Sequence, residues 1–278
     1  MKLLATSDLH LGYDENRRAL GELPAHPDDW LILAGDTGEA LAHLELALDE
    51  LVPRFARVIW TPGNHDLWAP ATRPGYPRGE ALYDALVARC RSRGVLTPED
   101  PFVEWPGPGP RRVIAPVFTL YDYSFRPDDV PAEEAVSWAR ASGVLCADER
   151  YLASDPYPSR QAWCAERVRV SEARLTVISA DARVVLVNHF PLHPSHADLR
   201  LIPRFSIWCG TRQTEDWHTR FRVEVVVHGH LHRRSRRWLD GVRFEEVSLG
   251  YPRQWRQDRG LEGHLTEVVS EGAKSESG

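Results

Sequence analysis

The chain has 278 residues, of which 42% are hydrophobic and 27% are charged, a composition typical of a globular domain. No apolar stretch reaches the roughly 18 residues of a membrane helix, and the N-terminus lacks the apolar core of a secretory signal. The net charge of −6 argues against a general nucleic-acid binder, which usually carries a basic face. We therefore expect a single cytoplasmic domain over residues 1–260, with neither a membrane nor a nucleic acid as partner.

Short apolar runs that end in a polar cluster recur along the chain, and each predicts a buried strand. They span residues 3–6, 30–34, 58–60, 113–117, 184–187 and 223–227. Between the second and third runs, residues 41–51 carry leucines at helical spacing and predict a helix. The dipeptide Asp240-Gly241 predicts a two-residue hairpin turn, because both turn positions need positive φ. Together these elements favour an α/β sandwich of two packed sheets with helices outside.

Several other segments are predicted from their composition. Residues 69–78 and 105–112 are dense in proline and glycine and should be loops. Residues 261–278 are small and polar, and we expect a disordered tail. Trp238 is expected in the core, whereas Trp208, Trp217 and Trp255 could form either a binding wall or core.

Charge and cysteine placement add two further observations. Residues 200–260 contain 13 arginines against seven acidic residues, a local balance of +6. This segment either provides a positive field for an anionic substrate or reflects the arginine-rich composition of the whole chain. The four cysteines are far apart and form no Cys-x-x-Cys pair, so they indicate neither a zinc site nor a disulfide framework.

Five polar clusters follow five of the six apolar runs and supply ligand types for divalent cations. They are Asp8-Leu9-His10, Gly35-Asp36 with Glu39 beyond it, Gly63-Asn64-His65-Asp66, Asn188-His189, and Gly229-His230-Leu231-His232. In an extended segment, residues two apart point to the same side, so Asp8 would pair with His10 and His230 with His232. Carboxylate, imidazole and amide ligands without thiolate suit manganese, iron or zinc.

Each cluster alone is a weak signal, and the alternatives are ordinary. An Asp-x-His pair occurs by chance, and Asn188-His189 could be a capped turn with a satisfied histidine. Because all five clusters leave the carboxyl ends of predicted strands, one sheet edge could gather them. Their joint occurrence in this order favours a metal site with enough ligands for two ions. Within it, Gly63 is expected to permit the backbone turn.

This ordered motif set, over residues 3–250, resembles the calcineurin-like metallophosphoesterase family. The resemblance implies a four-layer α/β/β/α sandwich of two mixed sheets flanked by helices. It further implies two metal positions that share Asp36 as a bridge. The first would be held by Asp8, His10, Asp36 and His232, and the second by Asp36, Asn64, His189 and His230.

The resemblance implies hydrolysis of a phosphodiester by a metal-bridging hydroxide. Two cations can lower the pKa of a shared water toward roughly 7 and clamp phosphate oxygens. His65 is the one imidazole of these motifs without a ligand role, and it could donate a proton to the leaving oxygen or stabilise charge on phosphorus. Asp66 could orient His65 by accepting a hydrogen bond, or it could be a solvent-facing cap of the following turn.

Substrate-binding candidates come from the segments around these motifs. Arg200, Arg204 and Arg212 lie between His189 and His230 and could contact a phosphate in bidentate fashion, or they could be surface arginines. Tyr123 could line the pocket or plug the core. We interpret His193 and His196 as loop histidines, because the ligand set is complete without them.

Residues 204–218 and 248–253 are similar to a bacterial subgroup of the family, the phosphopantetheinyl hydrolases. This similarity implies that the 4'-phosphopantetheine arm is removed from acyl or peptidyl carrier proteins. Carrier proteins are acidic, so the local +6 segment would attract one. The alternatives are a phosphodiesterase on a small nucleotide-like diester, a DNA nuclease, and a non-catalytic scaffold of the same fold.

Overall fold

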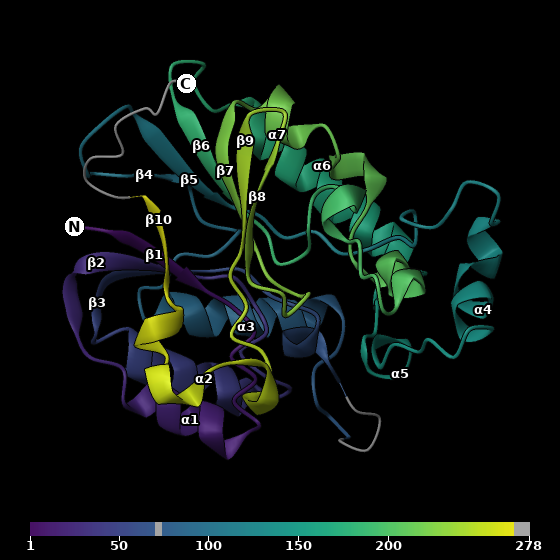
Figure 1. Ribbon diagram of the computed structural model, residues 1–278, viewed down its shortest axis with the longest axis horizontal. Helices are drawn as coiled ribbons and strands as arrows, with labels where there is room; N and C mark the ends of the chain where they lie inside the picture. The colour runs from purple at the N-terminus through teal and green to yellow at the C-terminus, as the bar shows by residue number, and fades with distance from the viewer. Residues whose placement is uncertain (70–73, 270–278) are drawn as a thin grey trace.

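The computed structural model describes residues 1–69 and 74–269. Two mixed β-sheets pack face to face, and helices cover their outer sides (Figure 1). The arrangement confirms the predicted sandwich of two sheets flanked by helices. No helix in the described ranges is long and apolar enough to cross a membrane.

The first sheet has four strands and the second has six. The first has the order β10-β1-β2-β3, formed by Thr266–Val269, Leu3–Thr6, His26–Leu33 and Phe55–Trp60. The second has the order β4-β5-β6-β7-β9-β8, formed by Val103–Glu104, Arg112–Pro116, Arg183–Val187, Val223–His228, Val242–Glu246 and Ser235–Leu239. In the first sheet only β10 pairs antiparallel, with β1, and the other pairs are parallel. In the second sheet the two outer pairs, β4 with β5 and β8 with β9, are antiparallel and the pairs between them are parallel, so both sheets are mixed.

The helices divide between the two outer faces. Helices α1 (Asp14–Gly21), α2 (Leu41–Leu51) and α3 (Glu80–Ser92) lie along the first sheet, and α6 (Arg160–Thr176) and α7 (Trp217–Arg220) lie along the second (Figure 1). The short helices α4 (Ala135–Arg140) and α5 (Asp148–Tyr151) project from one end of the sandwich (Figure 1).

Strand periodicity explains how the layers form. Side chains alternate across each strand, so Leu3 and Ala5 enter a cluster that also holds Val185 and Val225 from the second sheet. Leu4, which points the other way, joins the larger cluster that contains the helices. Both faces of these strands are therefore buried, and their continuous apolar runs reflect that burial.

The predicted elements agree closely with this architecture. The six apolar runs fall on β1, β2, β3, β5, β6 and β7, and each run ends within one residue of the carboxyl end of its strand. The predicted helix coincides with α2. Asp240 and Gly241 have φ values of 50° and 77° and connect the antiparallel strands β8 and β9, as the hairpin prediction requires. Residues 105–111 form a loop as expected, whereas residues 70–73 of the other predicted loop lie outside the described residues.

Two predictions from composition are wrong. Residues 261–269 are not a disordered tail, because Leu261 is buried and β10 pairs antiparallel with β1. This edge strand of four residues buries only Val268 and Val269, which leaves too weak an apolar pattern to recognise. Residues 270–278 lie outside the described residues.

Trp238 is 66% exposed instead of buried, because β8 is the outermost strand of its sheet. Trp208 and Trp217 are buried in the core, and Trp255 packs partly against it. The core interpretation therefore holds for Trp208 and Trp217, two of the three tryptophans that the sequence left open.

Candidate metal centre

The five polar clusters meet where the strands of both sheets end. Backbone hydrogen bonds hold the loops against one another, with the Asp8 amide donating to the Gly35 carbonyl and the Gly229 amide to the His189 carbonyl, both over 2.9 Å. A bridge between Ser7 and Ser248 connects the ends of the two sheets. The sandwich thus gathers clusters that lie more than 200 residues apart in the chain.

Most of the predicted ligands have an unusual backbone conformation. Positive φ values occur at Asp8 (53°), His10 (42°), Asp36 (54°), His230 (75°) and His232 (50°). For residues other than glycine this left-handed region costs of order 1–3 kcal/mol each, and such strain concentrates at functional sites. The expected pairing of residues two apart in an extended strand is therefore wrong as an explanation. Left-handed loops bring these side chains together.

Gly63 also has a role that differs from the predicted one. Its φ is not positive, so the turn does not require glycine for that reason. A Cβ atom at this position would instead collide with the carboxylate of Asp36. The absence of a side chain at Gly63 lets two of the loops approach each other closely.

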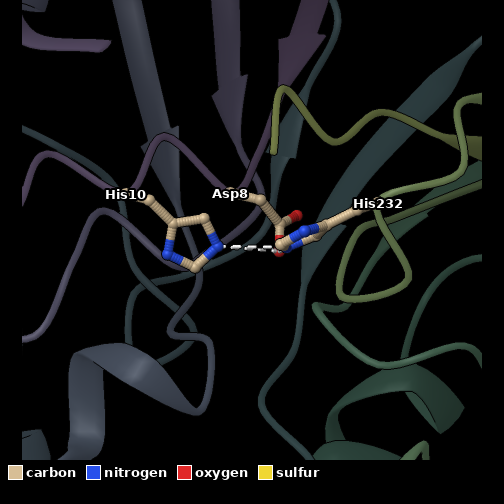
Figure 2. A group of neighbouring side chains, drawn as sticks. All are labelled: Asp8, His10 and His232. Carbon is tan, nitrogen blue, oxygen red and sulfur yellow. Dashed lines mark hydrogen bonds and ion pairs between the residues drawn. The ribbon is translucent and has the colours of Figure 1, made fainter. Parts of the chain in front are cut away.

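The first group of ligand atoms comprises Asp8, His10 and His232 (Figure 2). The Nε2 atoms of the two histidines lie 3.0 Å apart, and His232 Nε2 lies 3.1 Å from Asp8 Oδ1. His10 Nε2 lies 3.9 Å from the same oxygen. Two imidazole nitrogens that face each other beside a carboxylate suit a shared cation, because all three atoms can offer a lone pair.

The second group is built around Asn64. Its Oδ1 lies 3.2 Å from His189 Nε2 and 3.0 Å from His230 Nδ1. His189 Nε2 also lies 3.5 Å from Asp36 Oδ2. His189 Nδ1 lies 2.8 Å from the carbonyl oxygen of Ala34, and donation to this carbonyl leaves the Nε2 lone pair facing the group.

Asp36 lies between the two groups. It clusters with His10 and His65 on one side and with Asp8 and His189 on the other. The structure therefore brings together all seven predicted ligands and gives Asp36 the position that a bridging ligand needs. Two carboxylates, one amide, four imidazoles and no thiolate form a donor set that fits two borderline divalent cations.

The ionisation of Asp8 and His230 fits metal binding, whereas the pKa of His189, which burial would lower, is raised to about 10 by the charge and hydrogen bond of Asp36. Burial alone would raise the pKa of Asp8, but the hydrogen bond and charge of His232 hold it well below its ordinary value. Burial lowers the pKa of His230 to about 3. Asp8 is therefore ionised and His230 neutral, the states in which each can coordinate a cation.

Three side chains hold Asp8 and Asn64 in place, and none belongs to a motif. The Ser7 and Ser248 hydroxyls donate to Asp8 Oδ2 over 2.5 and 2.7 Å. Asp148, which is completely buried, accepts a hydrogen bond of 2.9 Å from Asn64 Nδ2. This contact fixes the orientation of the amide, so that Oδ1 faces the histidines.

His65 is held by Glu39 and not by Asp66. Glu39 Oε1 lies 3.1 Å from His65 Nδ1. The Trp68 ring stacks on the His65 imidazole, with 3.8 Å between the ring centroids. Trp68 Nε1 donates to the same oxygen of Asp148 that binds Asn64, over 2.7 Å. The position of Glu39, three residues after Asp36, was the available signal in the sequence.

Asp66 has neither of its predicted roles. It is buried, and it accepts hydrogen bonds from the backbone amides of Asp36, Thr37 and Gly63 and from the Thr37 hydroxyl. Asp66 is therefore neither the partner of His65 nor a solvent-facing cap. Its carboxylate ties two of the site loops together. Burial, with the negative charge of Asp36, raises its pKa to about 6.

A cavity of about 290 Å³ opens over the site. Its polar part includes Asp36, Asn64, His65, His230 and His232. Its apolar part includes Leu145, Leu199, Ile202, Phe205 and Leu231. The cavity therefore offers a cation-binding floor and an apolar wall to a single ligand.

Most of the predicted substrate residues lie elsewhere. Tyr123 is buried, and its hydroxyl lies 2.8 Å from Glu149. The Arg204 guanidinium stacks over Trp138 at 4.5 Å, and Arg212 Nε donates to the carbonyl of Ser124. These three residues are absent from the cavity lining.

Arg200 is the substrate candidate that lies beside the cavity. It is exposed and follows Leu199, which lines the cavity. Of the two loop histidines, His196 is buried with its ring stacked on Phe244, and His193 lies outside both ligand groups.

The fold and the ligand groups together define a metallophosphoesterase. Residues 1–234 match the family model for calcineurin-like phosphoesterases, so the chain belongs to this family, which uses divalent metals. It is 49% identical over 257 residues to the acyl-carrier-protein phosphodiesterase PptH of Mycobacterium tuberculosis (strain ATCC 25618 / H37Rv), covering 92% of this chain and 79% of that protein.

A solved structure gives the same relationship. The chain is similar to the crystal structure of phosphopantetheinyl hydrolase (PptH) from Mycobacterium tuberculosis, with a TM-score of 0.92 and 46% sequence identity. The similarity covers 99% of this chain and 98% of that one. The whole fold is therefore shared, including the segments that surround the cavity.

Proposed function

We propose that this protein is a dinuclear metal-dependent phosphodiesterase that releases 4'-phosphopantetheine from holo acyl or peptidyl carrier proteins in the cytoplasm. The observation that carries the proposal is the convergence of the seven predicted ligand side chains beneath a cavity that also holds His65. The 49% identity to a protein named as an acyl-carrier-protein phosphodiesterase supports the choice of substrate. The four cysteines are free thiols, in keeping with a reducing compartment.

Manganese, iron or zinc would fit the two positions. Asp8, His10, Asp36 and His232 would hold one ion, and Asp36, Asn64, His189 and His230 the other. When bound, such a pair makes a water molecule acidic enough to ionise near neutral pH and neutralises charge on the phosphate. A non-catalytic scaffold would have no need of the complete ligand set or of the strained loops that present it.

The protein's own residues would act on the leaving oxygen. In the proposed reaction a bond forms between phosphorus and the oxygen of water, and the bond from phosphorus to the serine Oγ breaks. Glu39 accepts a hydrogen bond from His65 Nδ1, so Nε2 is the atom that can give a proton to the serine oxygen. Stacking on Trp68 keeps the imidazole plane fixed while the substrate enters.

The proposal is tested by incubating purified holo carrier protein with the enzyme and manganese and weighing the carrier by mass spectrometry. We expect conversion to the apo mass together with free 4'-phosphopantetheine. His65→Ala, a variant that keeps all seven proposed ligands, is the control and should leave the arm attached. An intact arm after incubation with wild-type enzyme that hydrolyses bis-p-nitrophenyl phosphate would reject the carrier protein as substrate.

A further inference from the structure

The mouth of the cavity carries exposed apolar side chains from two separate loops. Leu145 and Ile202 line the cavity and are 68% and 46% exposed, and Leu201, next to Ile202, is 96% exposed. Three of the seven large hydrophobic side chains that are exposed in the described part of the chain thus gather at one place. Clustered exposed apolar residues at a site mark a contact surface more often than scattered ones do.

Unpaired arginines flank the same opening. Arg200 stands between the lining residues Leu199 and Ile202, and Arg253 stands between Tyr251 and Gln254, which also line the cavity. Both arginines are exposed, and neither has an ion-pair or hydrogen-bond partner among the described residues. Most other arginines of residues 200–260 do have partners, for example Arg236 with Glu245.

We propose that Leu145, Leu201, Ile202, Arg200 and Arg253 form the docking surface for the body of the holo carrier protein. This inference rests on the proposed function and names the part of the enzyme that recognises the protein portion of that substrate. The surface combines an apolar patch with free positive charge, which complements the acidic character of a carrier protein.

The chemistry of the substrate requires such a contact. Only the Oγ and Cβ atoms of the serine stand between the scissile phosphorus and the carrier backbone. When the phosphate reaches the floor of the cavity, the carrier body must therefore rest on the rim. The pantetheine arm remains bonded to phosphorus through the other ester oxygen and can follow the apolar wall formed by Leu199 and Phe205. Enzyme and carrier are thus in contact throughout the reaction.

The test compares two substrates for two rim variants. Leu201→Asp and Arg253→Glu change residues outside the cavity lining, so neither should alter turnover of bis-p-nitrophenyl phosphate. On holo carrier protein we expect kcat/KM to fall by roughly 10-fold for each variant, and we expect the wild-type value to fall as salt rises. The matched controls are Val177→Asp, which replaces an apolar side chain that is 82% exposed, and Arg18→Glu, which replaces an exposed arginine of α1.

Each outcome decides the inference. Selective loss on the carrier protein, with both controls active, supports the docking surface. Full activity of the rim variants on the carrier would overturn it and leave the proposed function standing. Equal loss on both substrates would overturn it as well, because the defect would be general. If the wild-type enzyme cleaves only the small diester, the proposed function fails and the docking surface fails with it.

Discussion

Asp148→Ala removes the carboxylate that fixes both Asn64 and Trp68, whose ring stacks on His65. One oxygen of Asp148 accepts the hydrogen bonds from Asn64 Nδ2 at 2.9 Å and from Trp68 Nε1 at 2.7 Å. A hydrogen bond to a charged group contributes about 1.5–3 kcal/mol. Without the acceptor, the Asn64 amide can rotate and turn its nitrogen toward the histidines, where it cannot coordinate a cation.

Loss of a residue that orients a ligand weakens metal binding by about 10–100-fold. We therefore expect the dissociation constant for the weaker of two manganese ions, measured by isothermal titration calorimetry, to rise by that factor in Asp148→Ala. Asp148→Asn keeps an acceptor oxygen and should retain most of the affinity. The activity of Asp148→Ala should come closer to the wild-type activity at saturating manganese than at limiting manganese.

Glu99→Ala is the matched control for this experiment. Glu99 accepts hydrogen bonds from Tyr83 and Arg167, so its removal also breaks two side-chain contacts, but away from the metal centre. Both variants should unfold at a lower temperature, whereas only Asp148→Ala should bind manganese more weakly. Unchanged manganese affinity in Asp148→Ala would refute the argument that this carboxylate orients Asn64.

Three further predictions concern the catalytic and metal-binding residues. His65→Ala should keep close to two metal ions per chain and lose about 10²–10⁴-fold in kcat, because a general acid contributes about that much; a fully active variant would exclude His65 from the reaction. Asp36→Asn should lose metal from both positions, and elemental analysis that still finds two ions per chain would contradict the shared bridge. Glu39→Gln should keep its metals and lose less activity than His65→Ala, with no further loss in the double variant, because Glu39 acts through His65; additive losses would show that the two residues act separately.

The sequence predicted the strands and the meeting of the five polar clusters because both depend on local patterns. Continuous apolar runs such as residues 184–187 identify strands that are buried on both faces. The polar clusters directly follow these runs in the chain, and the carboxyl ends of parallel strands lie at one edge of a sheet. His189 and Asn64 therefore meet although 125 residues separate them. Periodicity and chain order were sufficient to predict that the clusters meet, whereas the division of their side chains between two metal positions rests on the family resemblance.

The errors around His65 come from contacts that sequence proximity does not report. Asp66 is next to His65 in the chain, but the tight turn that begins at Gly63 directs its carboxylate toward the amides of Asp36 and Thr37. Glu39 approaches from a different strand end. Asp148 reaches Asn64 from a short helix in a segment without regular pattern, so no local signal indicated it.

Two of the remaining errors arise at the edges of the sheets. Trp238 lies on the edge strand β8 and is exposed although a tryptophan is expected in the core. The edge strand β10 buries so few side chains that its composition resembles a disordered segment. Arg204 and Arg212 were chosen by their position between two motifs, but Trp138 and the carbonyl of Ser124 hold them away from the cavity. Tertiary packing decides these cases.

The central claim is that two cations occupy one centre built by seven residues from five strand ends. The direct measurement is anomalous diffraction from crystals of the protein grown or soaked with manganese. We predict two peaks that share Asp36, one among Asp8, His10 and His232 and the other among Asn64, His189 and His230. A single peak, or peaks away from these side chains, would contradict the account.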